Sequence, residues 1–219
     1  LVPNPRNSMT FLAGLYSRNG YYEEAEKIYR RALESYRDDP QLHCNLGILL
    51  ASTGREQEAG AAFNRAHKLE PSNAMVLNNL GLLAFRGKQP DRALEYFQQS
   101  LTVAPGNPQA LNFSGLCFMM KQDLPSAEQS LLKAVEAAPE DASVRTNLGN
   151  LYRRAGKIAP AAEQFRLALM FDGRRAVNYL NLAMILRELG QTDQAAAVAS
   201  EGLKRFPDHA RLAKLATTN

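Results

Sequence analysis

The stretch PQLHCNLGILLASTGREQEAGAAFNRAHKLEPSN, residues 40–73, decides the fold, because the rest of the chain repeats it. Within it, Leu46 and Gly47 are followed by Ala59, Phe63 and Pro71, and the same residue types recur when the frame moves by 34 residues. No insertion interrupts the six frames, which are residues 6–39, 40–73, 74–107, 108–141, 142–175 and 176–209. A fixed period of this length indicates a repeat architecture in which each unit packs on its neighbours.

Three columns of the repeat, numbered 1–34 within each frame, are especially regular. Position 20 is alanine in all six frames, as in Ala59, and position 8 is always glycine or alanine, as in Gly47. Glycine inside a helix costs about 1 kcal/mol relative to alanine, so position 8 predicts that another backbone approaches closely there. Position 24 is bulky in five frames, as in Phe63, and such side chains fill the space between neighbouring helices.

These columns resemble the tetratricopeptide repeat (TPR), whose pattern is L-G-x2-Y…A-x3-F…P. The resemblance implies an all-α fold, a right-handed α-solenoid of helix–turn–helix repeats, with helix A at positions 1–14 and helix B at about 18–31. Glycine marks the turn at position 15 in four frames. Frames three and four lack this glycine but have Pro90 and Pro125 near the start of helix B, where proline is tolerated.

The chain contains no linker or low-complexity segment, so we predict a single TPR domain over residues 1–219. Residues 1–5 are rich in proline and are expected to be a lead-in rather than helix. Residues 210–219 follow the sixth frame and predict a partial capping helix that frays at the C-terminus. The chain begins at Leu1 without a methionine, so we expect it to be part of a longer protein.

Composition excludes several classes of function. The net charge is only +4, and the basic residues are spread over all frames, which argues against nucleic-acid binding. No apolar run is long enough for a membrane span. Cys44 and Cys117 lie two repeats apart, so we expect two unpaired thiols. The three histidines form no metal or catalytic motif, so we predict no cofactor and no enzymatic activity.

The resemblance also implies where a ligand binds, because positions 2, 5, 6, 9, 12 and 13 of TPR A helices face a concave groove. Helical spacing independently places these positions on one face. Position 6 carries Asn45, Asn79, Asn147 and Asn181. An asparagine ladder suits hydrogen bonding to an extended peptide backbone, as in arrays resembling the superhelix of the O-linked GlcNAc transferase. Equally, asparagine at this position can serve the packing of neighbouring repeats.

The remaining predicted groove residues differ in character along the chain. The middle frames contribute apolar side chains, and the last two frames contribute polar and basic ones; the groove prediction comprises Leu82, Phe85, Phe113, Met119, Met120, Asn150, Arg153, Arg154 and Arg187. Exposed apolar surface marks interaction sites, and arginine binds carboxylates through paired hydrogen bonds. We therefore predict a protein or peptide partner that is apolar and has an acidic end.

The leading hypothesis is a non-enzymatic scaffold that binds a protein segment in this groove. The style of the repeats is similar to that of bacterial TPR proteins of pilus and secretion assembly, which suggests an assembly factor. The alternative is a substrate-binding or regulatory TPR arm of a larger enzyme, such as a TPR-fused transferase. Self-association through the end repeats is a further prediction. The compartment is not assigned, and bacterial periplasm and cytoplasm both remain open.

Overall fold

The computed structural model describes residues 5–217, and the regular elements in this range are all helices. They are α1 (Pro5–Arg18), α2 (Tyr22–Ser35), α3 (Pro40–Ser52), α4 (Glu56–Leu69), α5 (Ala74–Arg86), α6 (Pro90–Val103), α7 (Pro108–Met120), α8 (Leu124–Ala137), α9 (Ala142–Arg154), α10 (Ile158–Phe171), α11 (Ala176–Glu188), α12 (Thr192–Arg205) and α13 (Ala210–Ala216). They form two compact units, Leu1–Pro105 and Gly106–Asn219, which meet in sequence at the end of the third repeat. That the two units act as one domain stays a prediction.

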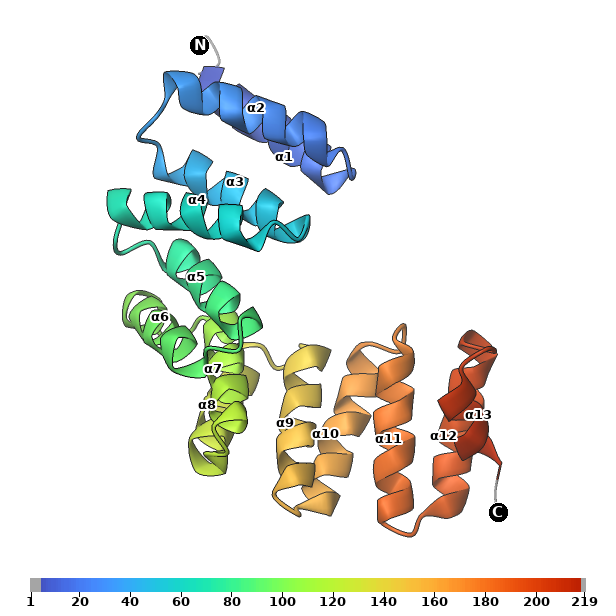
Figure 1. The fold of residues 1–219 in the computed structure, drawn as a ribbon. Coiled ribbons are helices and arrows are strands. Elements are labelled where there is room, and N and C mark those ends of the chain that lie inside the picture. The colour runs from blue at the N-terminus through green and yellow to red at the C-terminus, as the bar shows by residue number, and fades with distance from the viewer. Residues whose placement is uncertain (1–4, 218–219) are drawn as a thin grey trace. The chain divides into compact units, whose positions relative to one another are not determined.

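Within each unit, consecutive helices pack as antiparallel hairpins that stack in chain order (Figure 1). The odd-numbered helices α1 to α11 are the A helices of the six repeats, and the even-numbered helices α2 to α12 are the B helices. Helix A ends at position 13 and helix B begins at position 17 in the repeats from the second onward, each within one residue of the prediction. The expected all-α solenoid of helix–turn–helix repeats is confirmed.

Capping side chains fix the starts of the A helices α3, α5, α7 and α9. The Asp39 carboxylate accepts a hydrogen bond from the Leu42 N–H at 2.9 Å, and the Asn73 side chain accepts one from the Val76 N–H at 3.1 Å. Such caps satisfy backbone donors that have no partner inside the helix. Pro5, expected to lie in the lead-in, is instead the first residue of α1, because proline lacks only a donor that the first turn does not use. Residues 1–4, 218 and 219, including the end of the predicted fraying tail, lie outside the described residues.

The turn from helix A to helix B requires a left-handed residue at position 15. Glycine supplies it in four repeats, with φ between +73° and +84°. In the third and fourth repeats the same conformation is taken by Lys88, with φ of 56°, and Gln122, with φ of 63°. A residue with a Cβ pays about 1–2 kcal/mol for this conformation, so these two turns carry local strain.

Replacing Gln122 with glycine is therefore expected to raise the free energy of unfolding of the second unit by up to about 1 kcal/mol, because the strain exceeds the added chain entropy of glycine. Urea unfolding followed by circular dichroism measures the change. The control is Lys121→Gly, one residue earlier at φ −80°, which is expected to destabilise the unit. Equal losses for the two variants would contradict the assignment of strain to position 15.

The glycines at position 8 make room for a side chain. A Cβ added to Gly47, Gly81 or Gly149 would lie 2.5–2.7 Å from the phenylalanine ring at position 24 of the same repeat. At these three positions the nearest atoms belong to the ring, which takes the space that a Cβ would need, whereas at Gly115 a backbone does approach closely, with the Ala127 carbonyl 3.3 Å from the Cβ position. In the fourth repeat Leu131 replaces the ring and fills the same place against Gly115.

The first repeat leaves part of its A helix uncovered. Leu12 at position 7 is 43% exposed, whereas Leu46, at position 7 of the second repeat, is only 5% exposed. In the second repeat the preceding B helix, α2, packs against α3 and covers this side. No helix among the described residues covers α1 in the same way. This face supports the prediction of self-association through an end repeat, which sedimentation at several protein concentrations would test.

Candidate functional site

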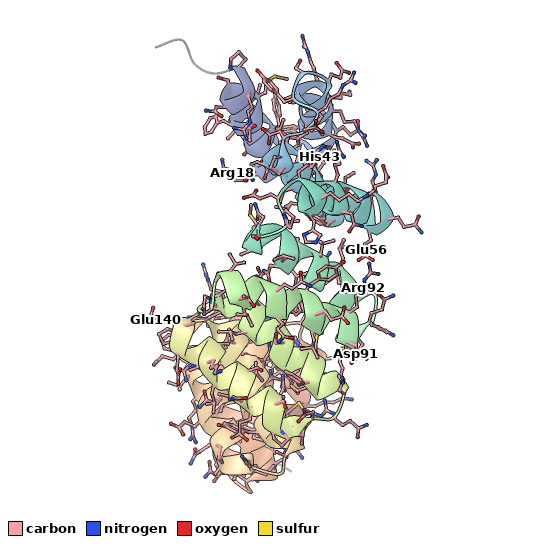
Figure 2. The ribbon with its side chains drawn as sticks, turned by 90° about the vertical axis from the view of Figure 1, so that its left-hand side faces the viewer. Arg18, His43, Glu56, Asp91, Arg92 and Glu140 are labelled. Carbon is pink, nitrogen blue, oxygen red and sulfur yellow. The ribbon has the colours of Figure 1, made fainter. Side chains whose placement is uncertain are left out.

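The A helices of the first unit form an open pocket of about 310 Å³ between α1 and α3. Phe11 and Ile48 line it and are 67% and 40% exposed, so both present apolar surface to solvent. Asn45 also lines the pocket, and so does Arg18 near the end of α1 (Figure 2). The pocket thus combines an exposed apolar surface with an amide and a cation.

The base of this pocket is formed by Tyr29 of α2 together with Leu49 of α3. Burial raises the pKa of the Tyr29 hydroxyl above its ordinary value of 10.0, so the phenol stays neutral throughout the physiological range. Arg18 donates a hydrogen bond to the Gly14 carbonyl at 3.3 Å but remains exposed. Its guanidinium therefore supplies the positive charge at this site.

The predicted groove residues of the first unit are all half-buried. Asn45 accepts a hydrogen bond from Gln41 at 2.9 Å within α3, and Asn79 donates one to the Met75 carbonyl at 2.8 Å within α5. Leu82 and Phe85 lie on α5. Of these predicted residues, the α1–α3 pocket includes Asn45.

Arg18 was missed by the sequence prediction, although its position pointed to it. It stands at position 13, a column that the TPR resemblance assigns to the groove. Its neighbours in the pocket, Phe11 and Ile48, stand at positions 6 and 9. The groove prediction followed the asparagines at position 6. The first frame carries Phe11 at that position, so this pattern does not point to Arg18.

In the second unit, Met119 differs from the prediction. Its side chain is only 7% exposed and packs in a cluster with Leu131, Leu148 and Leu151. The next A helix, α9, contacts α7 and covers this position, so Met119 belongs to the core. Met120, the following residue, is exposed, and Phe113 is half-buried.

The basic residues of the second unit are partly neutralised. The Arg153 guanidinium lies 3.5 Å from the Glu188 carboxylate, and both side chains are well exposed, so the pair contributes little to stability. Arg154 and Arg187 are exposed and form no ion pair with any residue in the range 5–217. Two arginines therefore remain available to an acidic ligand, rather than three.

The asparagines of the second unit bear on the two interpretations of position 6. Asn147 of α9 donates a hydrogen bond to the Asn112 side-chain oxygen of α7 at 2.9 Å, so it links two neighbouring A helices. Asn112 is buried. Asn181 and Asn150 are half-buried. For Asn147, the packing interpretation therefore has direct support from a contact between repeats.

Replacing Asn147 with alanine is expected to lower the free energy of unfolding of the second unit by about 1–3 kcal/mol, because the buried Asn112 oxygen loses its donor. The matched control is Asn79→Ala, whose hydrogen bond is exposed and lies within a single helix, so that its loss should cost less than about 0.5 kcal/mol. Urea unfolding measures both. An Asn147 variant of unchanged stability would favour the peptide-ladder interpretation instead.

Metal sites and membrane-spanning helices are two further features that can be sought among the described residues. Among residues 5–217, no group of three His, Cys, Asp or Glu side chains is placed to hold a metal ion, and no helix has the length and apolar character needed to cross a bilayer. Cys44 and Cys117 are both buried, and neither forms a disulfide bond within residues 5–217.

Comparison with known proteins identifies the repeats. The tetratricopeptide-repeat family model matches residues 12–74, 61–108, 78–142, 121–177 and 180–215, in overlapping segments that include most of the chain. The chain belongs to the tetratricopeptide repeat family. No curated protein sequence matches this TPR chain.

Solved TPR structures share the fold. PilW, a widely conserved type IV pilus biogenesis factor, is similar with a TM-score of 0.88 and 23% identity, over 98% of this chain and 100% of that one. PilF of Pseudomonas aeruginosa is similar with a TM-score of 0.83 and 20% identity, over 95% of both chains. YrrB, a TPR protein with an unusual peptide-binding site, has a TM-score of 0.64 and 20% identity, over 85% of this chain and 96% of that one.

Proposed function

We propose that this TPR protein is a non-enzymatic scaffold whose A-helix face binds a peptide or protein segment. The pocket between α1 and α3 supports the proposal most directly, because Phe11 and Ile48 expose apolar surface there beside Asn45 and Arg18. Apolar surface with a few polar groups is the usual composition of a recognition site. The ligand is a segment with an apolar side chain next to an acidic group.

Each part of the pocket has a role in this proposal. Phe11 and Ile48 take up the apolar side chain of the ligand, and burying it from water supplies most of the binding energy. Asn45 hydrogen-bonds the ligand backbone through the donor or acceptor not used by Gln41. Arg18 pairs with the acidic group and selects against basic ligands. Arg154 and Arg187 serve the same role for a ligand of the second unit.

The experiment selects peptides from a displayed random library on the purified protein and measures their affinity by fluorescence anisotropy. Ile48→Ala and Arg18→Glu should each weaken binding by about tenfold or more. Leu132→Ala is the matched control, because Leu132 is 40% exposed, as Ile48 is, but lies on a B helix of the second unit. Equal affinity of all three variants would contradict the proposal.

We infer further that the scaffold is an assembly factor for a bacterial pilus or secretion system. This rests on the likeness to PilW over nearly the whole of both chains. The test is deletion of the coding sequence in the source organism, followed by counting surface pili and measuring secreted protein. Loss of either that the wild-type gene restores, and the Ile48→Ala gene does not, is the expected result. Normal pili and normal secretion would overturn this role while leaving the peptide-binding proposal standing.

A further inference from the structure

A second and larger pocket, of about 550 Å³, opens between the B helices α4 and α6 of the first unit. Leu80, Leu83 and Ala84 of α5 form its floor, and Gly60 of α4 forms part of its wall. It shares no residue with the α1–α3 pocket. Its volume lies within the range of about 300–1,000 Å³ that ligand sites occupy.

An ion pair that joins neighbouring B helices at two places in the chain is absent beside this pocket, as it is between α10 and α12, where Ala162 and Gln191 hold the two positions. Between α2 and α4, Glu26 at position 21 of the repeat contacts Arg55, the residue just before α4, at 2.5 Å. Between α8 and α10, Glu128 of α8 contacts Lys157, the residue just before α10, at 2.8 Å. Between α4 and α6 the same two positions carry Gly60 and Gln89, both of which line the pocket.

The loss of this link is not compensated by the surrounding side chains. A Cβ added to Gly60 would meet only the Leu83 Cδ1, at 3.8 Å, which is ordinary contact distance. Leu83 is therefore only half-buried, whereas Leu80 and Ala84 are buried, and alanine in place of Gly60 would favour the helix by up to about 1 kcal/mol. A glycine that costs stability and keeps apolar surface accessible is consistent with a binding role.

Two opposite charges stand on the rim of the pocket. Glu56 lies at the start of α4 and Arg92 in the first turn of α6, and both project from the same side of the unit (Figure 2). Neither forms an ion pair with any residue of the described range. The Arg92 guanidinium lies 5.9 Å from the Tyr96 ring centroid, and Tyr96 also lines the pocket. The rim is thus negative on the α4 side and positive on the α6 side.

We propose that this pocket is a second docking site, which takes one large apolar side chain of a partner peptide segment. The segment carries a basic residue on one side of that anchor and an acidic residue on the other, which pair with Glu56 and Arg92 respectively. The apolar anchor supplies the affinity and the two charges fix the direction of the segment. Because the two pockets share no residue, one partner segment can bind at each of them.

The test uses Gly60→Leu, which fills the pocket with a side chain while improving the helix propensity of α4. The probe is a displayed library of random 14-residue peptides, selected on the wild-type protein in the presence of excess peptide for the α1–α3 pocket, or on the Ile48→Ala variant if no such peptide exists. Selected peptides should carry a Leu, Ile, Met or Phe between a basic and an acidic residue. Gly60→Leu should weaken them by about tenfold or more, and Ile48→Ala should leave them unchanged.

Charge reversal provides the second measurement. Glu56→Arg combined with Arg92→Glu should weaken the selected peptides and restore the binding of peptides whose two charged residues are exchanged. Selection that yields no peptide sensitive to Gly60→Leu would overturn the proposal. So would a dimer, seen by sedimentation, that Gly60→Leu abolishes, since the occupant would then be a second copy of this chain. If the proposal for the α1–α3 pocket is wrong, Ile48→Ala and Arg18→Glu will not weaken peptides selected for that pocket. That result does not bear on the pocket between α4 and α6.

Discussion

Replacing Phe97 with alanine is expected to lower the free energy of unfolding of the first unit by about 3–5 kcal/mol. The Phe97 ring is fully buried between α5 and α6 and lies against Gly81, so its removal leaves a cavity that no neighbouring side chain can fill. Urea unfolding followed by circular dichroism measures the loss.

The control for this loss is Tyr22→Ala, which removes an aromatic side chain that is 42% exposed at the start of α2 and should cost much less than the loss of the fully buried Phe97. A second comparison tests the cause. In the Phe97→Ala background, Gly81→Ala should no longer destabilise, because the atoms that its Cβ would meet are gone. A similar loss for Tyr22→Ala, or no coupling between positions 81 and 97, would contradict the assigned packing.

The second large effect is expected in the second unit, where Gly149→Val should cost about 1–3 kcal/mol through overpacking. A Cβ at this position would lie 2.7 Å from the Phe165 ring. The ring cannot move away, because it is buried in a cluster with Ala161, Leu182 and Leu186. Differential scanning calorimetry should show the second unit melting at a lower temperature.

Gly60→Ala is the matched control for Gly149→Val, because both glycines lie inside helices but only Gly149 faces a ring. Gly60→Ala should stabilise the first unit by up to about 1 kcal/mol, since alanine is the better helix former and meets no close neighbour. Destabilisation by both substitutions to the same extent would show that helix geometry, rather than the Phe165 ring, requires Gly149.

The repeat pattern predicted the helices well because burial and helix stops recur at fixed positions. The alanines at position 20 and the glycine turns at position 15 mark the hairpins directly, and the observed helix ends differ from the prediction by about one residue. Lys88 and Gln122 show the limit of this signal. They adopt the turn conformation that glycine adopts elsewhere, because packing on both sides of the turn outweighs their local preference.

The candidate sites could be predicted only in part. Helical spacing places Phe11, Ile48 and Arg18 on the A-helix face, but it cannot show that their side chains enclose a pocket. Met119 has the same spacing and is buried, because α9 covers it. The pocket between α4 and α6 depends in part on the absence of a side chain at Gly60; the sequence shows this glycine, but it does not show that the residues around it leave a pocket open.

Each unit contains one buried thiol, Cys44 in the first and Cys117 in the second. Burial, followed by the charge of Glu70, raises the pKa of Cys44 to about 11, so this thiol cannot react quickly until its helix hairpin opens. Alkylation kinetics followed by mass spectrometry would therefore time the opening of each half of the array separately, without any added label. The two cysteines are therefore built-in probes of local unfolding, one in each unit.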